Sequence, residues 1–262
     1  RSACRQAQID AATVRCRVGC AGFSGGPADK EGILRDLLRA DSLQVTTDAV
    51  VALAGATARE PGIITIAGTG SISYGRNRAG QFARAGGWGY IFGDEGGAFD
   101  ITRQALRAVL RNEEGWGPPT LLRDSLLQET GATDANDLMH LFYTPEFPRP
   151  LVASYAQIVN RAAADGDAVA RNILLNAAQQ LAGITSAVHG QLFSEGEPCQ
   201  VAYIGGVFQS ELLLERFRIL VELDGGSTLI PPMYGPAVGA LLEAYASAGL
   251  NATLSNVPES EK

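Results

Sequence analysis

The stretch GGWGYIFGDEGG, residues 86–97, sets one tryptophan and two carboxylates on a backbone that contains six glycines. Ordering such a segment is costly, because glycine loses more backbone freedom on folding than any other residue. A sugar suits this combination, since its C–H face packs on an aromatic ring and its hydroxyls donate to a carboxylate. Asp94 also precedes a predicted helix, whose dipole favours negative charge. The dipole explains the acid but leaves Trp88 unexplained.

A second glycine-containing turn, Gly68-Thr69-Gly70-Ser71, directly follows a predicted strand. Its glycines allow close approach to the main chain, so that backbone N–H groups and the two hydroxyls can face a phosphate. Tight hairpins use the same residue types for the turn itself, which leaves a purely structural interpretation open. The sequence contains neither G-x-x-x-x-G-K-[ST] nor G-x-G-x-x-G. A bound nucleotide would therefore use neither of those loops.

Asp48 lies between a predicted strand and a predicted helix. It is either a helix cap or a general base at the carboxyl end of a strand, where open α/β sheets gather ligands. The chain has two histidines, both within helical patterns. This disfavours a Ser-His-Asp triad and favours a carboxylate as the acid–base group. Gly205 and Gly206 follow another strand and leave room for a flat ring, although a simple tight turn explains them too. Ser210 either caps the next helix or contacts that ring.

Hydrophobic periodicity places these residues on an ordered set of elements. Strands are expected at residues 14–20, 43–46, 63–67, 72–75, 81–85, 200–204 and 227–230. Helices are expected at residues 1–8, 30–39, 49–58, 98–110, 211–220 and 236–248, with a mostly helical insertion at about 115–195. The order βαβα occurs near both ends of the chain, which indicates a weak internal duplication. The second copy follows a βββα segment, and by symmetry we expect a matching segment ahead of Arg1.

Composition and charge limit the functions that the chain can have. With 262 residues and a formal net charge of -7, and without a basic run, the chain would repel long phosphate backbones, so we expect no nucleic-acid partner. No apolar stretch approaches a membrane span and no signal peptide is visible, so we expect no membrane partner. On a strand, Cys16 and Cys20 would lie roughly 13 Å apart, too far for one metal ion. Free thiols indicate the cytoplasm.

Four motifs in this order, TTDA, IAGTGS, GGWGYIFGDEGG and IGGVFQS, resemble those of the N-acetylglucosamine kinase branch of the BadF/BadG/BcrA/BcrD ATPase family. The resemblance runs from about residue 19 to residue 249. It implies an α/β fold of the actin/sugar kinase/Hsp70 superfamily, with two RNase H-like lobes around a cleft. The expected lobes are residues 1–60, which lack the upstream βββα portion, and residues 61–262.

The resemblance also implies an activity, ATP-dependent phosphorylation of an amino sugar at its 6-hydroxyl, with ATP and Mg²⁺ as cofactors and a homodimer as a possible assembly. Asp48, in the motif TTDA, resembles the family's general base, which acts on a sugar hydroxyl. The residues that resemble sugar contacts are Ser24, Gly87, Trp88, Gly89 and Asp94. The residues that resemble nucleotide contacts are Thr69, Gly70, Ser71, Gly205, Gly206 and Ser210. No residue is assigned to Mg²⁺.

One departure from the family pattern keeps alternatives open. The family's first phosphate loop, Asp-Gly-Gly-Gly-Thr-x-Thr, has no match here, and we expect it in a segment upstream of Arg1. If that loop is truly absent, the chain is a non-catalytic sugar-binding relative. The other alternative is an ATP-driven switch that activates a dehydratase or reductase through an iron–sulfur cluster, which the scattered cysteines disfavour.

Overall fold

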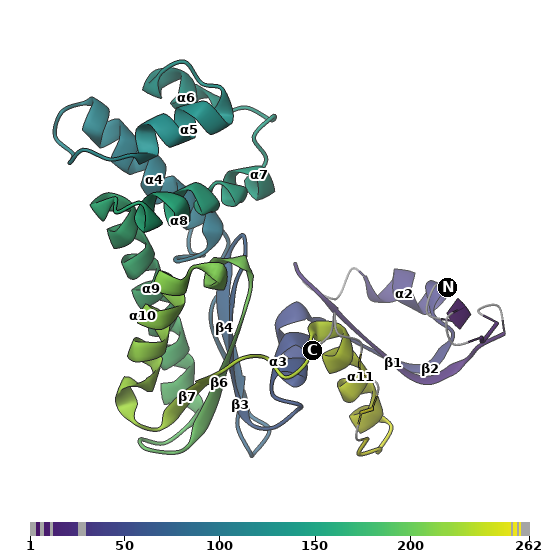
Figure 1. The fold of residues 1–262 in the computed structure, drawn as a ribbon. Coiled ribbons are helices and arrows are strands. Elements are labelled where there is room, and N and C mark those ends of the chain that lie inside the picture. The colour runs from purple at the N-terminus through teal and green to yellow at the C-terminus, as the bar shows by residue number, and fades with distance from the viewer. Residues whose placement is uncertain are drawn as a thin grey trace. The chain divides into compact units, whose positions relative to one another are not determined.

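The computed structural model describes residues 4–5, 8–10, 13–25, 30–252, 254–255 and 257. The helix expected at residues 1–8 therefore lies largely outside the described residues. The chain forms two compact units, which are considered separately (Figure 1). The first combines Arg1–Glu60 with Pro232–Lys262, and the second is the continuous segment Pro61–Pro231.

The first unit is built on a two-stranded parallel sheet among its described residues. Strand β1 (Cys16–Phe23) is followed by α2 (Glu31–Leu37), β2 (Ala40–Thr47) and α3 (Asp48–Ala56). The register runs from Cys16 opposite Ala40 to Phe23 opposite Thr47, so both strands end at the same edge. The βαβα order predicted for this part of the chain is confirmed.

The last helix, α11 (Pro236–Ser247), packs on α3 and β1 within the first unit. Two glycines allow the close approach: a Cβ at Gly55 would overlap the Gly235 carbonyl oxygen, and one at Gly239 would overlap the Val51 carbonyl oxygen. The expected division placed residues 232–262 with the second lobe. The structure groups them with residues 1–60 instead, because α11 packs closely against α3 at Gly239.

The second unit contains a five-stranded sheet of order β5-β4-β3-β6-β7. Strands β3 (Gly62–Ala67), β4 (Ser71–Arg76) and β5 (Phe82–Gly86) form the antiparallel meander. Strands β6 (Cys199–Ile204) and β7 (Ser227–Ile230) extend it in parallel from β3. This mixed sheet is the one expected from the βββα and βαβ segments. It brings the ends of β3 and β6, each followed by a glycine motif, side by side.

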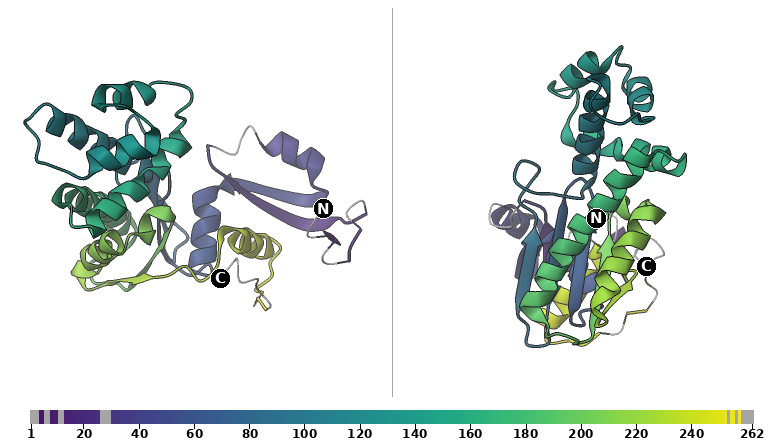
Figure 2. Two further views of the ribbon diagram at one scale, coloured as in Figure 1. Left: turned by 45° about the horizontal axis from the view of Figure 1, so that its top comes forward. Right: turned by 90° about the vertical axis from the view of Figure 1, so that its left-hand side faces the viewer.

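Two long helices cover one face of this sheet, α9 (Ala168–Leu192) and α10 (Glu211–Val221) (Figure 2). A buried hydrogen bond of 2.7 Å joins the Thr65 and Thr185 hydroxyls, which ties α9 to β3. The remaining helices lie at one end of the sheet: α4 (Ala98–Glu113), α5 (Leu122–Thr130), α6 (Ala135–Leu141), α7 (Arg149–Ser154) and α8 (Ala156–Ala164). Two short 3₁₀ segments are η1 (Gly206–Gln209) and η2 (Glu222–Asp224). The apolar stripe predicted for α4 is buried at Ile101, Ala105 and Val109.

Candidate functional site

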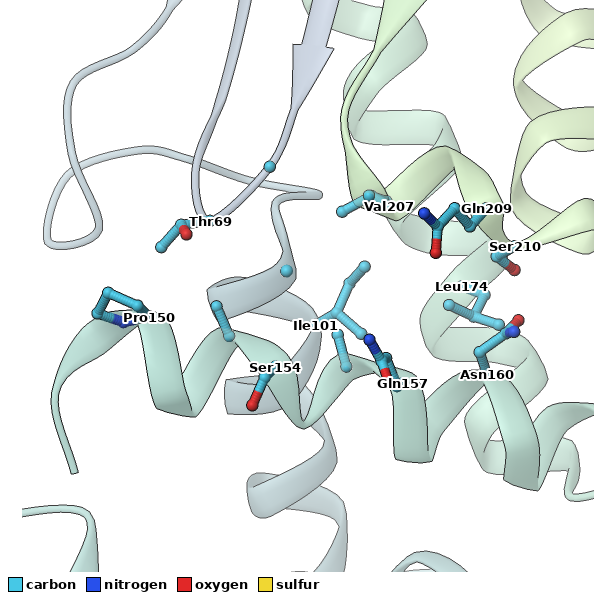
Figure 3. A pocket seen from close by; sticks show the side chains of 15 residues that line it. Thr69, Ile101, Pro150, Ser154, Gln157, Asn160, Leu174, Val207, Gln209 and Ser210 are labelled. Carbon is cyan, nitrogen blue, oxygen red and sulfur yellow. The ribbon is translucent and has the colours of Figure 1, made fainter. Parts of the chain in front are cut away.

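The turn at residues 68–71 is fixed against the start of α4. The Ala98 N–H donates to the Gly68 carbonyl oxygen at 2.9 Å, and the Phe99 N–H donates to the Thr69 carbonyl oxygen at 3.1 Å. These bonds satisfy helix N–H groups that would otherwise lack partners. They hold the turn at the rim of a pocket, with the Thr69 side chain facing it (Figure 3).

The pocket has a volume of about 370 Å³ and lies entirely within the second unit. The turn at residues 68–69 forms one side and residues 206–210 form another, while α7 and α8 supply the wall between them (Figure 3). The lining residues with polar side chains are Thr69, Ser154, Gln157, Asn160, Gln209 and Ser210. The structure therefore brings together two of the motifs that were expected to bind a nucleotide.

The residues after β6 have distinct roles. Gly205 has φ +119°, and a Cβ there would overlap the carbonyl oxygen of Ala67, so glycine is required where β3 and β6 end together. A Cβ at Gly206 would meet nothing within 4 Å, which leaves open space in the pocket. Ser210 caps α10, its hydroxyl accepting from the Leu213 N–H at 3.4 Å, and it also lines the pocket. The cap is thus confirmed, and contact of Ser210 with a bound ring stays a prediction.

Ser71 differs from its expected role. Its side chain is buried, and its hydroxyl donates to the Glu95 carbonyl oxygen at 2.7 Å. The hydroxyl was expected to face a phosphate, whereas the structure uses it to anchor residues 86–97 to the turn. Gly70 also faces this loop rather than the pocket, because a Cβ there would overlap the Asp94 carboxylate.

The Asp94 carboxylate is nearly buried, with its side chain 10% exposed. It accepts from the Ser71 N–H at 3.4 Å and from Arg149 Nη2 at 3.3 Å. The residue has φ +62°, an uncommon conformation for a side chain other than glycine that occurs most often at turns and functional sites. The loop thus holds an acidic group beside the turn at residues 68–71.

Trp88, by contrast, is 66% exposed. The Arg84 guanidinium lies 4.8 Å from the centre of its ring. The neighbouring Gly87 and Gly89 both have positive φ, +71° and +79°, so the loop turns sharply on each side of the tryptophan. The loop therefore presents an aromatic ring to solvent instead of packing it in the core.

Ser24 and Asp48 occupy matching positions in the first unit. Phe23 pairs with Thr47, so Ser24 and Asp48 are the next residues along the two parallel strands, at the same edge of the sheet. Both are exposed. The Asp48 carboxylate accepts from the Ala49 N–H at 2.9 Å at the start of α3. The remaining expected site residues belong to the second unit.

Comparison with known proteins decides the family. Residues 1–244 match the BadF/BadG/BcrA/BcrD ATPase family. The chain belongs to this family. A relative from Clostridium acetobutylicum, named N-acetylmuramic acid/N-acetylglucosamine kinase, is 34% identical over 215 residues, which is 80% of this chain and 70% of the relative. One from Dictyostelium discoideum, named N-acetyl-D-glucosamine kinase, is 30% identical over 246 residues, 87% of this chain and 75% of the relative.

A solved structure supports the fold. A Chromobacterium violaceum protein described as a candidate N-acetylglucosamine kinase superposes with a TM-score of 0.74 at 26% sequence identity, over 91% of this chain and 79% of the other. The chain thus shares the mixed α/β fold of this solved structure.

An ATPase family implies a nucleotide, and the pocket fits one in its chemistry. None of the residues that line it carries a charged side chain. Phosphate oxygens would therefore be bound by backbone N–H groups and hydroxyls. Among the described residues, no group of three or more His, Cys, Asp or Glu side chains could hold a metal ion. Mg²⁺ usually keeps several waters and binds through substrate phosphates, so it requires no such cage.

The cysteines and the helices bear on other classes of function. Burial, with the nearby Glu243 charge, raises the pKa of the Cys20 thiol to about 11. Iron–sulfur clusters are held by thiolates, which this environment disfavours. None of the helices in the described part of the chain is long and apolar enough to span a bilayer.

A second pocket, of about 470 Å³, lies between α4 and α9 and contains none of the expected site residues. Volume alone would favour it over the pocket beside Thr69. We choose the pocket beside Thr69 because, of these two pockets, it is the one lined by the motifs at the ends of β3 and β6.

Sequence reasoning missed three polar residues of the insertion, Arg149, Gln157 and Asn160. The two amides line the pocket and Arg149 contacts Asp94. They sit in a helical pattern far along the chain from the glycine motifs, and no local spacing linked them to those motifs. The Pro-rich stretch TPEFPRP around Arg149 marked a turn only.

Proposed function

We propose that this family member transfers the γ-phosphoryl group of ATP to the 6-hydroxyl of an N-acetylglucosamine-type amino sugar. The observation that carries the proposal is the pocket between residues 68–69 and residues 206–210, with the carboxylate of Asp94 beside the same turn. The names of the two curated relatives support an amino sugar as the acceptor.

In this proposal the nucleotide lies along the pocket. Its phosphates face the turn at residues 68–69, and its adenosine lies near Gly206 and Ser210. Mg²⁺ would bind through the phosphates of the nucleotide, and it would supply positive charge that the neutral pocket lacks. The amides of Gln157 and Asn160 are available as donors and acceptors toward the nucleotide.

The sugar is proposed to pack against Trp88 and to donate hydroxyl hydrogen bonds to Asp94, with main chain at Gly87 and Gly89 close by. Ser24 lies near the acetamido group. Asp48 accepts the proton of the 6-hydroxyl as the new oxygen–phosphorus bond forms and the bond to the β-phosphate oxygen breaks, releasing ADP. Phosphoryl transfer leaves the protein little covalent chemistry, so positioning and charge stabilisation dominate.

A coupled ADP-release assay tests the proposal with N-acetylglucosamine, glucosamine, N-acetylmuramic acid and glucose, each against a sugar-free control. We expect turnover with at least one amino sugar well above the sugar-free rate. The 6-deoxy form of the active sugar locates the acceptor hydroxyl, since it should bind without releasing ADP. ADP release that is independent of sugar, or retained with the 6-deoxy sugar, contradicts the proposal.

Two further expectations belong with this proposal, a homodimer and a cytoplasmic location. Sedimentation velocity of the purified chain tests the first.

An iron–sulfur switch is not favoured, because the curated relatives are named kinases. Absence of sugar-dependent turnover together with retained sugar binding would instead support the non-catalytic alternative.

A further inference from the structure

Arg149 connects two parts of the second unit to which the proposed function gives separate roles, the nucleotide pocket and the loop at residues 86–97. It is the first residue of α7, and three other residues of that helix, Pro150, Ala153 and Ser154, line the pocket proposed for the nucleotide (Figure 3). The side chain of Arg149 extends to the loop at residues 86–97, where it contacts Asp94. Arg149 thus belongs by its backbone to a helix that lines the pocket, and its side chain contacts the glycine-rich loop.

Two contacts hold the Arg149 guanidinium on that loop, and a third joins it to Phe99 in the first turn of α4. Nη2 lies 3.3 Å from Oδ2 of Asp94, and the guanidinium carbon lies 4.4 Å from the centre of the Tyr90 ring and 5.8 Å from that of Phe99. The two rings meet edge to face, 5.2 Å apart. A planar guanidinium makes ion-pair and stacking contacts together, which a lysine ammonium does not reproduce.

The carboxylate at the centre of these contacts depends on the arginine. Asp94 is nearly buried, and its other protein donor is the Ser71 N–H at 3.4 Å. The Arg149 side chain is 41% exposed, but its removal leaves the nearly buried carboxylate with one donor fewer, which is unfavourable. The contact therefore links the position of α7 to that of Asp94.

A second arginine holds the loop from a different element. Arg103 of α4 donates through Nη1 to the Tyr90 carbonyl oxygen at 3.1 Å and pairs with Asp100 at 2.6 Å. Helix α4 is sixteen residues long, with Ile101, Ala105 and Val109 in the core. Helix α7 has six residues, of which Val152 and Ala153 are buried. Helix α7 has fewer residues in the core than α4, so we expect it to shift more readily when a ligand fills the pocket.

We propose that Arg149 is a positioning residue that couples occupancy of the nucleotide pocket to the geometry of the sugar loop at residues 86–97. The inference rests on the proposed function, because it takes the pocket as the nucleotide site and Asp94 as a sugar contact. A nucleotide against α7 sets Arg149, and Arg149 sets Asp94 and Tyr90. By linkage the sugar and the nucleotide then strengthen each other's binding equally.

A fluorescence experiment tests this coupling without needing turnover. The chain has two tryptophans, so Trp116→Phe leaves Trp88 as the only one, in the loop itself. Titration of this variant with the non-hydrolysable analogue AMP-PNP and Mg²⁺ should change the Trp88 emission. The double variant with Arg149→Ala should bind the analogue, measured by calorimetry, but lose most of the emission change. Arg149→Lys should restore it only in part.

Arg111→Ala is the matched control. Arg111 stacks on an aromatic ring, that of Trp116, at 4.9 Å, outside the loop and outside the nucleotide pocket. In steady-state assays with both tryptophans present, Arg149→Ala should raise the sugar KM about tenfold, a typical coupling magnitude, with a smaller change in the KM for ATP. Arg111→Ala should change neither.

The outcomes separate this inference from the proposed function. Analogue binding with an unchanged Trp88 signal in the Trp116→Phe variant, or an equal signal with and without Arg149, overturns the coupling and leaves the kinase proposal intact. Failure of the wild-type chain to bind the analogue overturns the nucleotide site, and the coupling with it. A raised KM for sugar that Arg111→Ala reproduces also overturns the coupling.

Discussion

At the scale of single residues, Asp48 combines a structural contact with the chemical role proposed for it. Its carboxylate accepts from the Ala49 N–H in the first turn of α3, whose N-cap is Thr47, and it stays exposed at the carboxyl end of β2. One carboxylate oxygen makes this hydrogen bond, so the other is free to accept a proton from a substrate hydroxyl in the proposed reaction.

Asp48→Asn tests that second role. The amide oxygen can still accept from the Ala49 N–H, so we expect an unchanged fold and sugar affinity. General-base catalysis is worth about 10²–10⁴-fold, and we expect kcat to fall within that range. The ADP-release assay measures kcat and calorimetry measures sugar binding. Turnover at the wild-type rate would remove Asp48 from the mechanism.

Gly70 and Gly68 provide a matched pair within one turn. A Cβ at Gly70 would overlap the Asp94 carboxylate, whereas one at Gly68 would meet nothing within 4 Å. We expect Gly70→Ala to lower the free energy of unfolding by about 1–3 kcal/mol, the usual cost of overpacking. Gly68→Ala should leave it nearly unchanged. Urea denaturation of both variants checks this, and equal stabilities would mean that Asp94 moves aside freely.

At the scale of elements, Asp167 joins two helices of the insertion. It caps α9 by accepting from the Ala170 N–H at 2.8 Å, and it accepts from the Thr120 hydroxyl at 2.9 Å just before α5. Burial disfavours the charge, but these hydrogen bonds and one from the Leu121 N–H outweigh it, so the pKa of Asp167 is lowered. The junction thus connects α9, which supplies Leu174 to the pocket, with the start of α5.

The lowered pKa predicts how stability depends on pH. A group whose pKa is lower in the folded state stabilises above its unfolded value, about 3.9 for Asp, and this stabilisation is lost as pH falls through the folded value. Asp167→Ala should lower the free energy of unfolding by about 1–3 kcal/mol at pH 7, since it leaves buried donors unpaired. The difference from wild type should shrink at pH values below the folded pKa.

Asp134→Ala is the control for this prediction. Asp134 caps α6 by accepting from the Asp137 N–H at 2.8 Å, but the bond is exposed. Its loss should cost about 0.5–1 kcal/mol. Denaturant unfolding at pH 7 and at a pH below the folded pKa of Asp167 compares the two variants. A cost at Asp134 as large as that at Asp167 would mean that the junction with α5 contributes nothing.

The elements themselves were largely predictable from the sequence. Alternating and helical periodicities placed the strands and the major helices to within a few residues, because each buries one apolar face, as Ile101 and Val109 do in α4. The pocket wall was not predictable, since Gln157 and Asn160 reach the glycine turns only through tertiary packing of the insertion. The contact of Ser71 was not predictable either. Its hydroxyl was expected to face a phosphate, but it donates to the carbonyl oxygen of Glu95, 24 positions later, and the residues around Ser71 do not reveal this contact.

At the scale of the whole molecule, the candidate residues divide between two units. Ser24 and Asp48 belong to one, and the nucleotide pocket, Trp88 and Asp94 belong to the other. A phosphoryl transfer that uses both sets requires the units to act together. The residues that we propose for nucleotide binding all belong to the second.

Hydrogen–deuterium exchange with mass spectrometry tests this division. AMP-PNP with Mg²⁺ should slow exchange at residues 68–71, 150–160 and 205–210, all in the second unit. Adding the amino sugar should then slow exchange around Ser24 and Asp48 in the first. Protection of the first unit by the nucleotide alone, as strong as with both ligands, would contradict the assignment of Asp48 to the sugar.

The pairing of α3 with α11 has a consequence for synthesis. The two helices meet through Gly55 and Gly239, yet residues 61–231 separate them in the chain. Translation at about 5–20 residues per second leaves roughly 10–40 s between the emergence of α3 and that of α11 from the ribosome. The second unit has all of its residues before the first does. The nascent polypeptide therefore completes the second unit before the first, and the apolar surface of α3 stays without its partner α11 during that interval.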